Sequence, residues 1–166
     1  MKNQEKPYRK NVGILVFNSQ MKVLVGDRVD HPENYQLPQG GIDEGENPED
    51  AAIRELYEET GLKLQKPVFE IPEWLSYDFP EHIPEHLKKY RGQTQKWFFF
   101  HWDGDIQSLD LNSSHHREFR TLKWMDIDVL VNSIIEFKKE VYLKIQKYFY
   151  EFVPEYLKTL YEKEKR

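Results

Sequence analysis

Residues 47–61 constrain the fold more than any other part of the chain, because both ends of a helix are marked in them. Asn47 is a favourable N-cap, and Pro48 suits the first helical position. Two acidic residues follow, and they favour the positive start of a helix. Gly61 stands where a left-handed C-cap is expected. The sequence therefore predicts a helix over Pro48–Thr60.

The predicted helix carries its acidic and its apolar residues on opposite faces. Glu55, Glu58 and Glu59 share an arc of roughly 100° when each residue advances by about 100°. The opposite side holds Ala52, Ile53, Leu56 and Tyr57. Like charges at this spacing destabilise a helix, whereas hard divalent cations bind carboxylates and bridge them to substrate phosphates. The pattern thus favours a metal-binding face.

Two other readings of these acidic residues are open on the residues alone. One is a solvated acidic face, which is the usual meaning of an isolated Glu-Glu pair. The other is a calcium loop of the EF-hand type, but the spacing D-x-[DN]-x-[DN]-G is absent. The chain has no cysteine, which excludes disulfides, thiolate metal sites and a cysteine nucleophile.

The bulk properties exclude several classes of protein. The 166 residues suit one domain, and a net charge of −5 argues against a general nucleic-acid binder. A polyanionic substrate would therefore need local basic residues or bound cations. No run approaches the roughly 20 apolar residues of a membrane span, and the first ten residues do not resemble a signal peptide. We expect a cytoplasmic protein without membrane contact.

Short β-forming segments flank the helix. Val12–Phe17 and Lys22–Gly26 are separated by turn-forming residues and predict a hairpin. The aromatic run Trp97–Trp102 predicts a buried strand, and Leu122–Met125 predicts a short one. Strands, a helix, more strands and a terminal helix together suggest a mixed α/β sandwich.

The C-terminal part predicts a helix that begins near Ser133 and runs toward Tyr150. Pro154 is expected to kink or break it. We therefore expect one domain over residues 1–154 and a charged helical tail over residues 155–166.

Residues 40–62 match the pattern G-x5-E-x7-R-E-U-x-E-E-x-G-U, with U aliphatic, at every fixed position. This pattern is the Nudix box, and nine positions at fixed spacing make it specific. The chain therefore resembles the Nudix hydrolases. The resemblance implies an α/β/α sandwich around a mixed β-sheet.

The resemblance extends from about Tyr8 to Tyr150 and points to one branch of the family. That branch contains bacterial RNA pyrophosphohydrolases and plant-type diadenosine tetraphosphate hydrolases. The segments that carry the likeness are Tyr8–Gly13, Gln36–Gly41, Trp74–Pro80, Gly92–Phe98 and Glu136–Tyr142.

In this branch the Nudix glutamates bind Mg²⁺ or Mn²⁺, a role that falls here to Glu55, Glu58 and Glu59. A glutamate on a later loop completes the site, and Glu118 matches it; the plain alternative is an exposed loop acid. The carbonyl of Gly40 is a further ligand by analogy. The family often has proline before the loop glutamate, where this chain has Arg117.

By the same resemblance, Arg9, Arg28 and Lys138 contact phosphates, and Phe137 stacks on a base. Each has a plain alternative. The three cations could simply be exposed, and Phe137 could be a core contact of the terminal helix.

The activity implied is metal-dependent hydrolysis of a pyrophosphate linkage, in which water attacks phosphorus and a carboxylate accepts its proton. Sequence does not tell which carboxylate does so. We favour 5′-triphosphorylated RNA ends as substrate, giving 5′-monophosphate RNA. The alternatives are asymmetric cleavage of dinucleoside polyphosphates to ATP and AMP, and a catalytically silent nucleotide-binding module. We expect a monomer.

Overall fold

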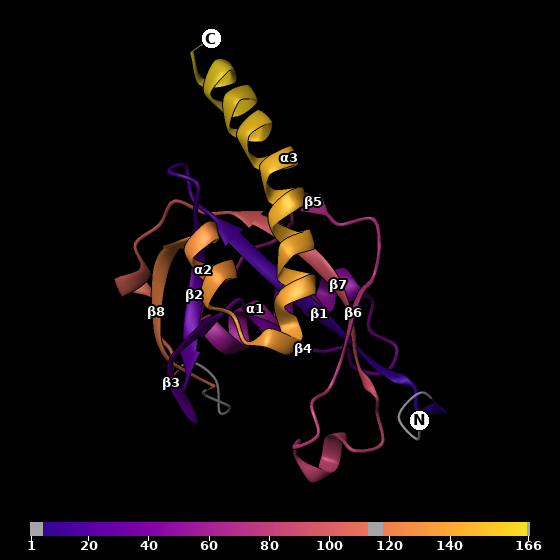
Figure 1. The fold of residues 1–166 in the computed structure, drawn as a ribbon. Coiled ribbons are helices and arrows are strands. Elements are labelled where there is room, and N and C mark those ends of the chain that lie inside the picture. The colour runs from indigo at the N-terminus through magenta and orange to yellow at the C-terminus, as the bar shows by residue number, and fades with distance from the viewer. Residues whose placement is uncertain (1–4, 113–117, 166) are drawn as a thin grey trace.

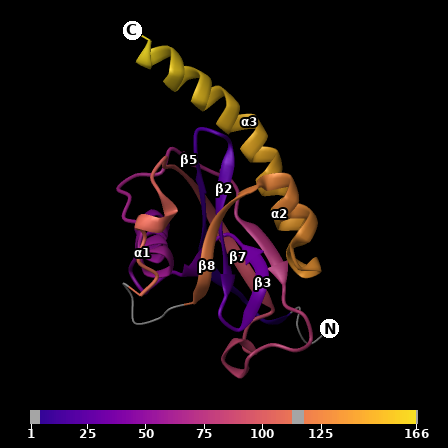
Figure 2. The ribbon, with the colours of Figure 1, turned by 90° about the vertical axis from the view of Figure 1, so that its left-hand side faces the viewer.

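The computed structural model describes residues 5–112 and 118–165 of the chain, and these form three layers (Figures 1 and 2). The strands are β1 (Tyr8–Phe17), β2 (Lys22–Arg28), β3 (His31–Gln36), β4 (Gln39–Gly41), β5 (Phe69–Glu70), β6 (Leu75–Asp78), β7 (Gly92–His101) and β8 (Phe119–Asp126). The helices are α1 (Pro48–Thr60), α2 (Ile127–Ser133) and α3 (Lys139–Glu164), with short 3-10 turns η2 (Glu85–Leu87), η3 (Ile106–Ser108) and η4 (Glu136–Lys138).

The described residues build one mixed sheet of eight strands. Its main path runs β3-β2-β1-β7-β5, while β4 pairs with β1, β6 with β7 and β8 with β2. The central pair β1 and β7 is parallel over ten residues, and the other pairs are antiparallel. Figure 2 shows α1 on one face of the sheet, and α2 and α3 on the other. The predicted α/β/α sandwich around a mixed sheet is confirmed.

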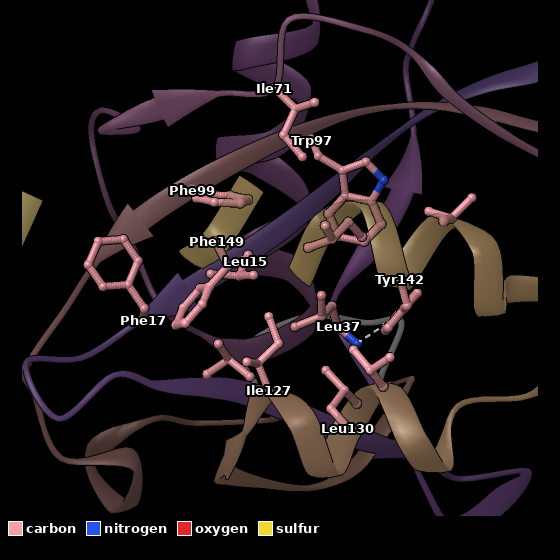
Figure 3. Close-up of a cluster of buried hydrophobic side chains, with 14 of the residues drawn as sticks. Leu15, Phe17, Leu37, Ile71, Trp97, Phe99, Ile127, Leu130, Tyr142 and Phe149 are labelled. Atoms are coloured by element: carbon pink, nitrogen blue, oxygen red, sulfur yellow. Dashed lines mark hydrogen bonds between the residues drawn. The ribbon is translucent and has the colours of Figure 1, made fainter. Parts of the chain in front are cut away.

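Alternation along the central strands divides the core into two parts, because successive side chains of a strand point to opposite faces. In β1, Val12, Ile14 and Val16 belong to the cluster beneath α1. Leu15 and Phe17 belong to the cluster beneath α2 and α3, which Figure 3 shows. The aromatic run of β7 alternates in the same way, so it is core on both faces, as predicted.

Local signals in the sequence predicted several elements well. The helix α1 begins and ends where expected: the Asn47 side chain accepts from the amide of Asp50, and Gly61 is left-handed with a φ of 78°. The hairpin is confirmed as β1 and β2, and both strands are longer than predicted. The strand predicted at Leu122–Met125 is the central part of β8.

The predicted start of the C-terminal helix near Ser133 was wrong. Ser133 ends a separate helix, α2, Ile134 is extended, and α3 begins at Lys139. The predicted break at Pro154 does not occur, because α3 runs through this position, while the alternative of a kink there stays a prediction. A proline inside a helix costs about 3 kcal/mol. Here fully buried Phe149 and Val153 anchor the helix to the core, and burial of each such side chain contributes roughly 1.5–3 kcal/mol, so packing outweighs the local cost.

The far end of α3 projects past the edge of the sheet (Figure 1). Tyr156 and Leu157 still pack against the core cluster. A domain boundary after residue 154 stays a prediction, although α3 crosses this position. Within residues 5–112 and 118–165, no helix combines the length and the apolar character needed to cross a membrane.

Candidate active site

The acidic face of α1 turns toward β4 and the start of β8. Glu59 is 4% exposed, and its Oε2 accepts a hydrogen bond from the Gln39 amide at 3.3 Å. Burial raises the pKa of Glu59 well above its usual value, and the carboxylates of Glu118 and Glu55 raise it further. The charged form of this buried carboxyl is therefore disfavoured, and a bound cation would favour it again.

Glu55 lies one turn earlier and is also largely buried. Burial raises the pKa of Glu55 to about 7, against the opposing charge of Arg54. The backbone of Gly40 passes so close that a Cβ at this position would overlap the Glu55 carboxyl group. Gly40 and Glu55 therefore lie side by side, while the role of the Gly40 carbonyl as a metal ligand stays a prediction.

Arg54 holds the loop before α1 against the helix. Its guanidinium donates to both oxygens of Glu46 at 2.9 Å and to the Gly41 carbonyl at 2.9 Å. It also pairs with Glu55 at 3.0 Å and with Glu58, one turn on, at 3.1 Å. Arg54 thereby limits the repulsion among the glutamates of α1.

Glu118 comes directly before β8 and reaches the same acidic cluster. Its side chain is half-exposed, and its carboxylate lies 3.8 Å from the Arg28 guanidinium. A hydrogen bond and charge repulsion from Glu118 contribute to the raised pKa of Glu59. The structure therefore brings Glu118 next to Glu59, although the two are far apart in sequence. Arg117 lies outside the described residues.

Of the three cations predicted to contact phosphates, Arg28 and Lys138 interact with the carboxylate of Glu59. Arg9 donates to Gln93 Oε1 at 2.8 Å, and Arg28 pairs with Asp30 at 3.0 Å. Lys138 is only 7% exposed and donates to Gln36 Oε1 at 3.0 Å. Burial lowers the pKa of Lys138 to about 8, and the charge of Arg28 lowers it further, while Glu59 opposes the shift. Lys138 is thus a buried cation, not the exposed one of the plain alternative.

Phe137, the residue before Lys138, lines a cavity of about 490 Å³. Its ring packs against the core cluster and lies 5.6 Å from the ring of Tyr77. The core contact is therefore present, and stacking on a base stays a prediction. The other lining residues are Tyr8, Ser76, Tyr77, Asp78, Glu136, Lys139 and Glu140.

A buried polar network under the site was missed by sequence reasoning. Gln93 accepts from Arg9 and, at 2.7 Å, from Asn11, and it donates to the hydroxyl of Tyr77. Gln39, whose amide holds Glu59, accepts from Gln95 at 3.0 Å. Gln93 and Gln95 lie just before the predicted strand Trp97–Trp102, and β7 extends back to include them. Their partners depend on the sheet register, which the sequence does not give.

The donor set suits a hard divalent cation, because its side-chain ligands are all carboxylate oxygens. Among the side chains that the structure describes, no group of three or more Asp, Glu or His residues can hold a metal ion as it stands. Arg54 holds Glu55 and Glu58, and Glu59 interacts with Glu118. These carboxylates would therefore have to rotate in order to share an ion.

Comparisons with known proteins identify the family of this chain. The NUDIX domain model matches residues 7–145. An RNA pyrophosphohydrolase of Bartonella clarridgeiae is 47% identical over 156 residues, covering 86% of this chain and 90% of that protein. One from Wolbachia pipientis subsp. Culex pipiens (strain wPip) is 42% identical over 147 residues, covering 87% and 91%. The crystal structure of a MutT protein from Methanosarcina mazei Go1 has a TM-score of 0.64 at 17% identity, covering 86% of this chain and 96% of that one. Nudix hydrolases generally need divalent cations. The chain belongs to the Nudix family.

Proposed function

We propose that this protein is a Nudix pyrophosphohydrolase that converts 5′-triphosphorylated RNA to 5′-monophosphate RNA. The observation that carries the proposal is the 47% identity to an RNA pyrophosphohydrolase over 86% of this chain and 90% of the relative. The arrangement of carboxylates and cations described above supports it.

The cations of the site offset the repulsion between a protein of net charge −5 and a polyanionic substrate. In this proposal Arg9, Arg28 and Lys138 bind non-bridging phosphate oxygens. Arg28 lies 3.8 Å from Glu118, Lys138 interacts with Glu59, and Arg9 lies against the backbone of Gly41. Burial strengthens the interaction of Lys138 with an anion because the local dielectric constant is low. Phe137 lies beside the base that follows the phosphates.

The glutamates hold the cation and one of them takes the proton of the attacking water. Glu55, Glu58, Glu59 and Glu118 would hold the divalent cation, Mg²⁺ with Mn²⁺ as a substitute, together with the carbonyl of Gly40. When bound, the cation would supply charge neutralisation at the phosphate oxygens and a lower pKa for the attacking water. The water oxygen forms a bond to phosphorus, a P–O–P linkage breaks, and pyrophosphate leaves from the RNA end.

The alternative substrate is a dinucleoside polyphosphate, cleaved asymmetrically to ATP and AMP. A silent binding module is the third reading, and the retained glutamates oppose it. We place the protein in the cytoplasm as a monomer, where RNA ends are accessible.

One assay separates these readings. The protein is given 5′-triphosphate RNA and diadenosine tetraphosphate at equal concentrations with Mg²⁺. Faster formation of 5′-monophosphate RNA is expected. Preferential release of ATP and AMP would instead support the dinucleotide activity, and no product from either substrate would support the binding module.

A further inference from the structure

Asp27 is a fully buried carboxylate that no part of the proposed reaction uses. It lies in β2, and it is 0% exposed. Its Oδ2 accepts from the Glu33 amide at 2.8 Å and from two nitrogens of Arg120 at 2.9 and 2.7 Å. Its Oδ1 accepts from the amide and hydroxyl of Thr121 at 3.0 and 2.6 Å. Asp27 thus joins three strands through one side chain.

The hydrogen bonds keep this carboxylate charged. Burial alone would raise the pKa of Asp27, but the bonds from Glu33, Thr121 and Arg120 outweigh it and hold the pKa well below its usual value. A buried charge held in this way is costly to unpair.

The pairing of β2 with β8 is irregular at this point. Asp27 pairs with Thr121, and Arg28 pairs with Phe119, so Arg120 is an extra residue between them. Such a bulge changes the direction of the side chains next to it. The guanidinium of Arg120 turns back to Asp27, and this contact fixes the bulge.

The residues beyond the bulge belong to the candidate active site. Arg28 follows Asp27 directly on β2, and the amide of Val29 donates to the carbonyl of Glu118 at 2.9 Å. The carboxylate of Glu118 lies 3.8 Å from Arg28 and interacts with Glu59. Arg120 and Thr121, which contact Asp27, therefore follow Glu118 closely along the chain.

We propose that Asp27 is a positioning residue, which through Arg120 and Thr121 holds the bulge that places Glu118 beside Glu59 and Arg28. The proposal rests on the proposed function, since the role of Glu118 as a cation ligand is assigned there. The rest of the β2–β8 pairing, from Lys22 to Gly26, is regular and does not depend on Asp27.

The test is Asp27→Asn, which keeps the shape of the side chain and removes its charge. We expect Mn²⁺, titrated calorimetrically without substrate, to bind roughly tenfold more weakly, as is typical when a group that orients a metal ligand is changed. The kcat is expected to fall more than KM changes. Thr121→Val, which removes one hydroxyl donor, should give a smaller loss in the same direction and serves if Asp27→Asn does not fold.

Asp103→Asn is the matched control. Asp103 also accepts a backbone amide and a hydroxyl, both from Ser19 at 2.7 Å, and it contacts His101 at 3.0 Å. It lies after β7, and none of these partners belongs to the acidic cluster. Asp103→Asn should leave Mn²⁺ affinity and kcat unchanged even if it lowers stability.

A double variant shows whether Asp27 acts through Glu118, since coupled residues give non-additive effects. In a Glu118→Gln background, Asp27→Asn should weaken Mn²⁺ binding no further. The proposal is overturned if the effects add, if Asp103→Asn does the same as Asp27→Asn, or if Glu118→Gln leaves Mn²⁺ binding unchanged. The two proposals can fail separately. If the wild type does not hydrolyse RNA ends but Asp27→Asn still weakens Mn²⁺ binding, the proposed function is refuted and the positioning role stands.

Discussion

The carboxyl group of Glu55 should make the protein less stable as the pH rises when divalent cations are absent. Its pKa in the folded protein is about 7, above the usual value of 4.5, because burial disfavours the charged form. A group with a raised folded pKa contributes stability that is complete below about pH 4.5 and is lost as the pH rises through about 7. The substitution Glu55→Gln removes this titration.

The size of the effect follows from the pKa. A rise from 4.5 to about 7 corresponds to roughly 3 kcal/mol, at about 1.36 kcal/mol per pH unit. Glutamine also loses the 3.0 Å ion pair with Arg54, but Arg54 keeps its contacts with Glu46 and Glu58. We therefore expect the stability of Glu55→Gln relative to the wild type to increase by roughly 3 kcal/mol between pH 4.5 and pH 8.5.

Urea unfolding at several pH values in the presence of EDTA measures this difference. Glu44→Gln, at an exposed position of the loop before α1, is the control and should follow the wild-type pH profile. Parallel stability profiles for the wild type and Glu55→Gln would refute the reasoning, because the carboxyl group would then not be destabilised by burial. Saturating Mg²⁺ should flatten the wild-type profile, since a cation binds the charged form.

Three further predictions follow from the site and the core. Glu58→Gln should lower kcat by roughly 10²- to 10⁴-fold with an unchanged circular dichroism spectrum, and near-normal turnover would contradict its role. Gly40→Ala should destabilise the fold by about 1–3 kcal/mol in urea unfolding because its Cβ overlaps the Glu55 carboxyl group, and wild-type stability would show that the backbone can move aside. Tyr142→Phe removes the hydroxyl that accepts from the Leu37 amide at 3.0 Å (Figure 3). It should cost about 1–3 kcal/mol in urea unfolding and leave kcat within a few-fold, and an equally large loss of kcat would place Tyr142 in the site.

The parts of the molecule that sequence predicted well are those whose signals are local. The helix α1 was predicted to the residue because Asn47, Pro48 and Gly61 act within one turn of its ends. Pro154 is an equally local signal for a break in the helix. No break occurs, because the burial of Val153 outweighs the local cost of the proline.

The candidate site divides in the same way. The spacing of Glu55 and Glu59 on one helix is a local property, so their shared face was predictable. The burial of Lys138 and the contacts of Asp27 were not, because both depend on which strands pair and in what register. Asp27 directly follows the predicted strand Lys22–Gly26, and the sequence gives no indication of which residues its carboxylate contacts.

The parallel pair at the centre of the sheet sets the order in which this chain can fold. Tyr8 pairs with Gly92 and Phe17 with His101, so each contact closes a loop of 84 residues. Contacts of such long range form slowly, because much chain entropy must be lost before they stabilise anything. The helix α1 lies inside that loop. During synthesis, the sheet surface on which it packs is therefore incomplete until β7 has been made. A nascent chain that ends before β7 therefore exposes the apolar residues of both core clusters.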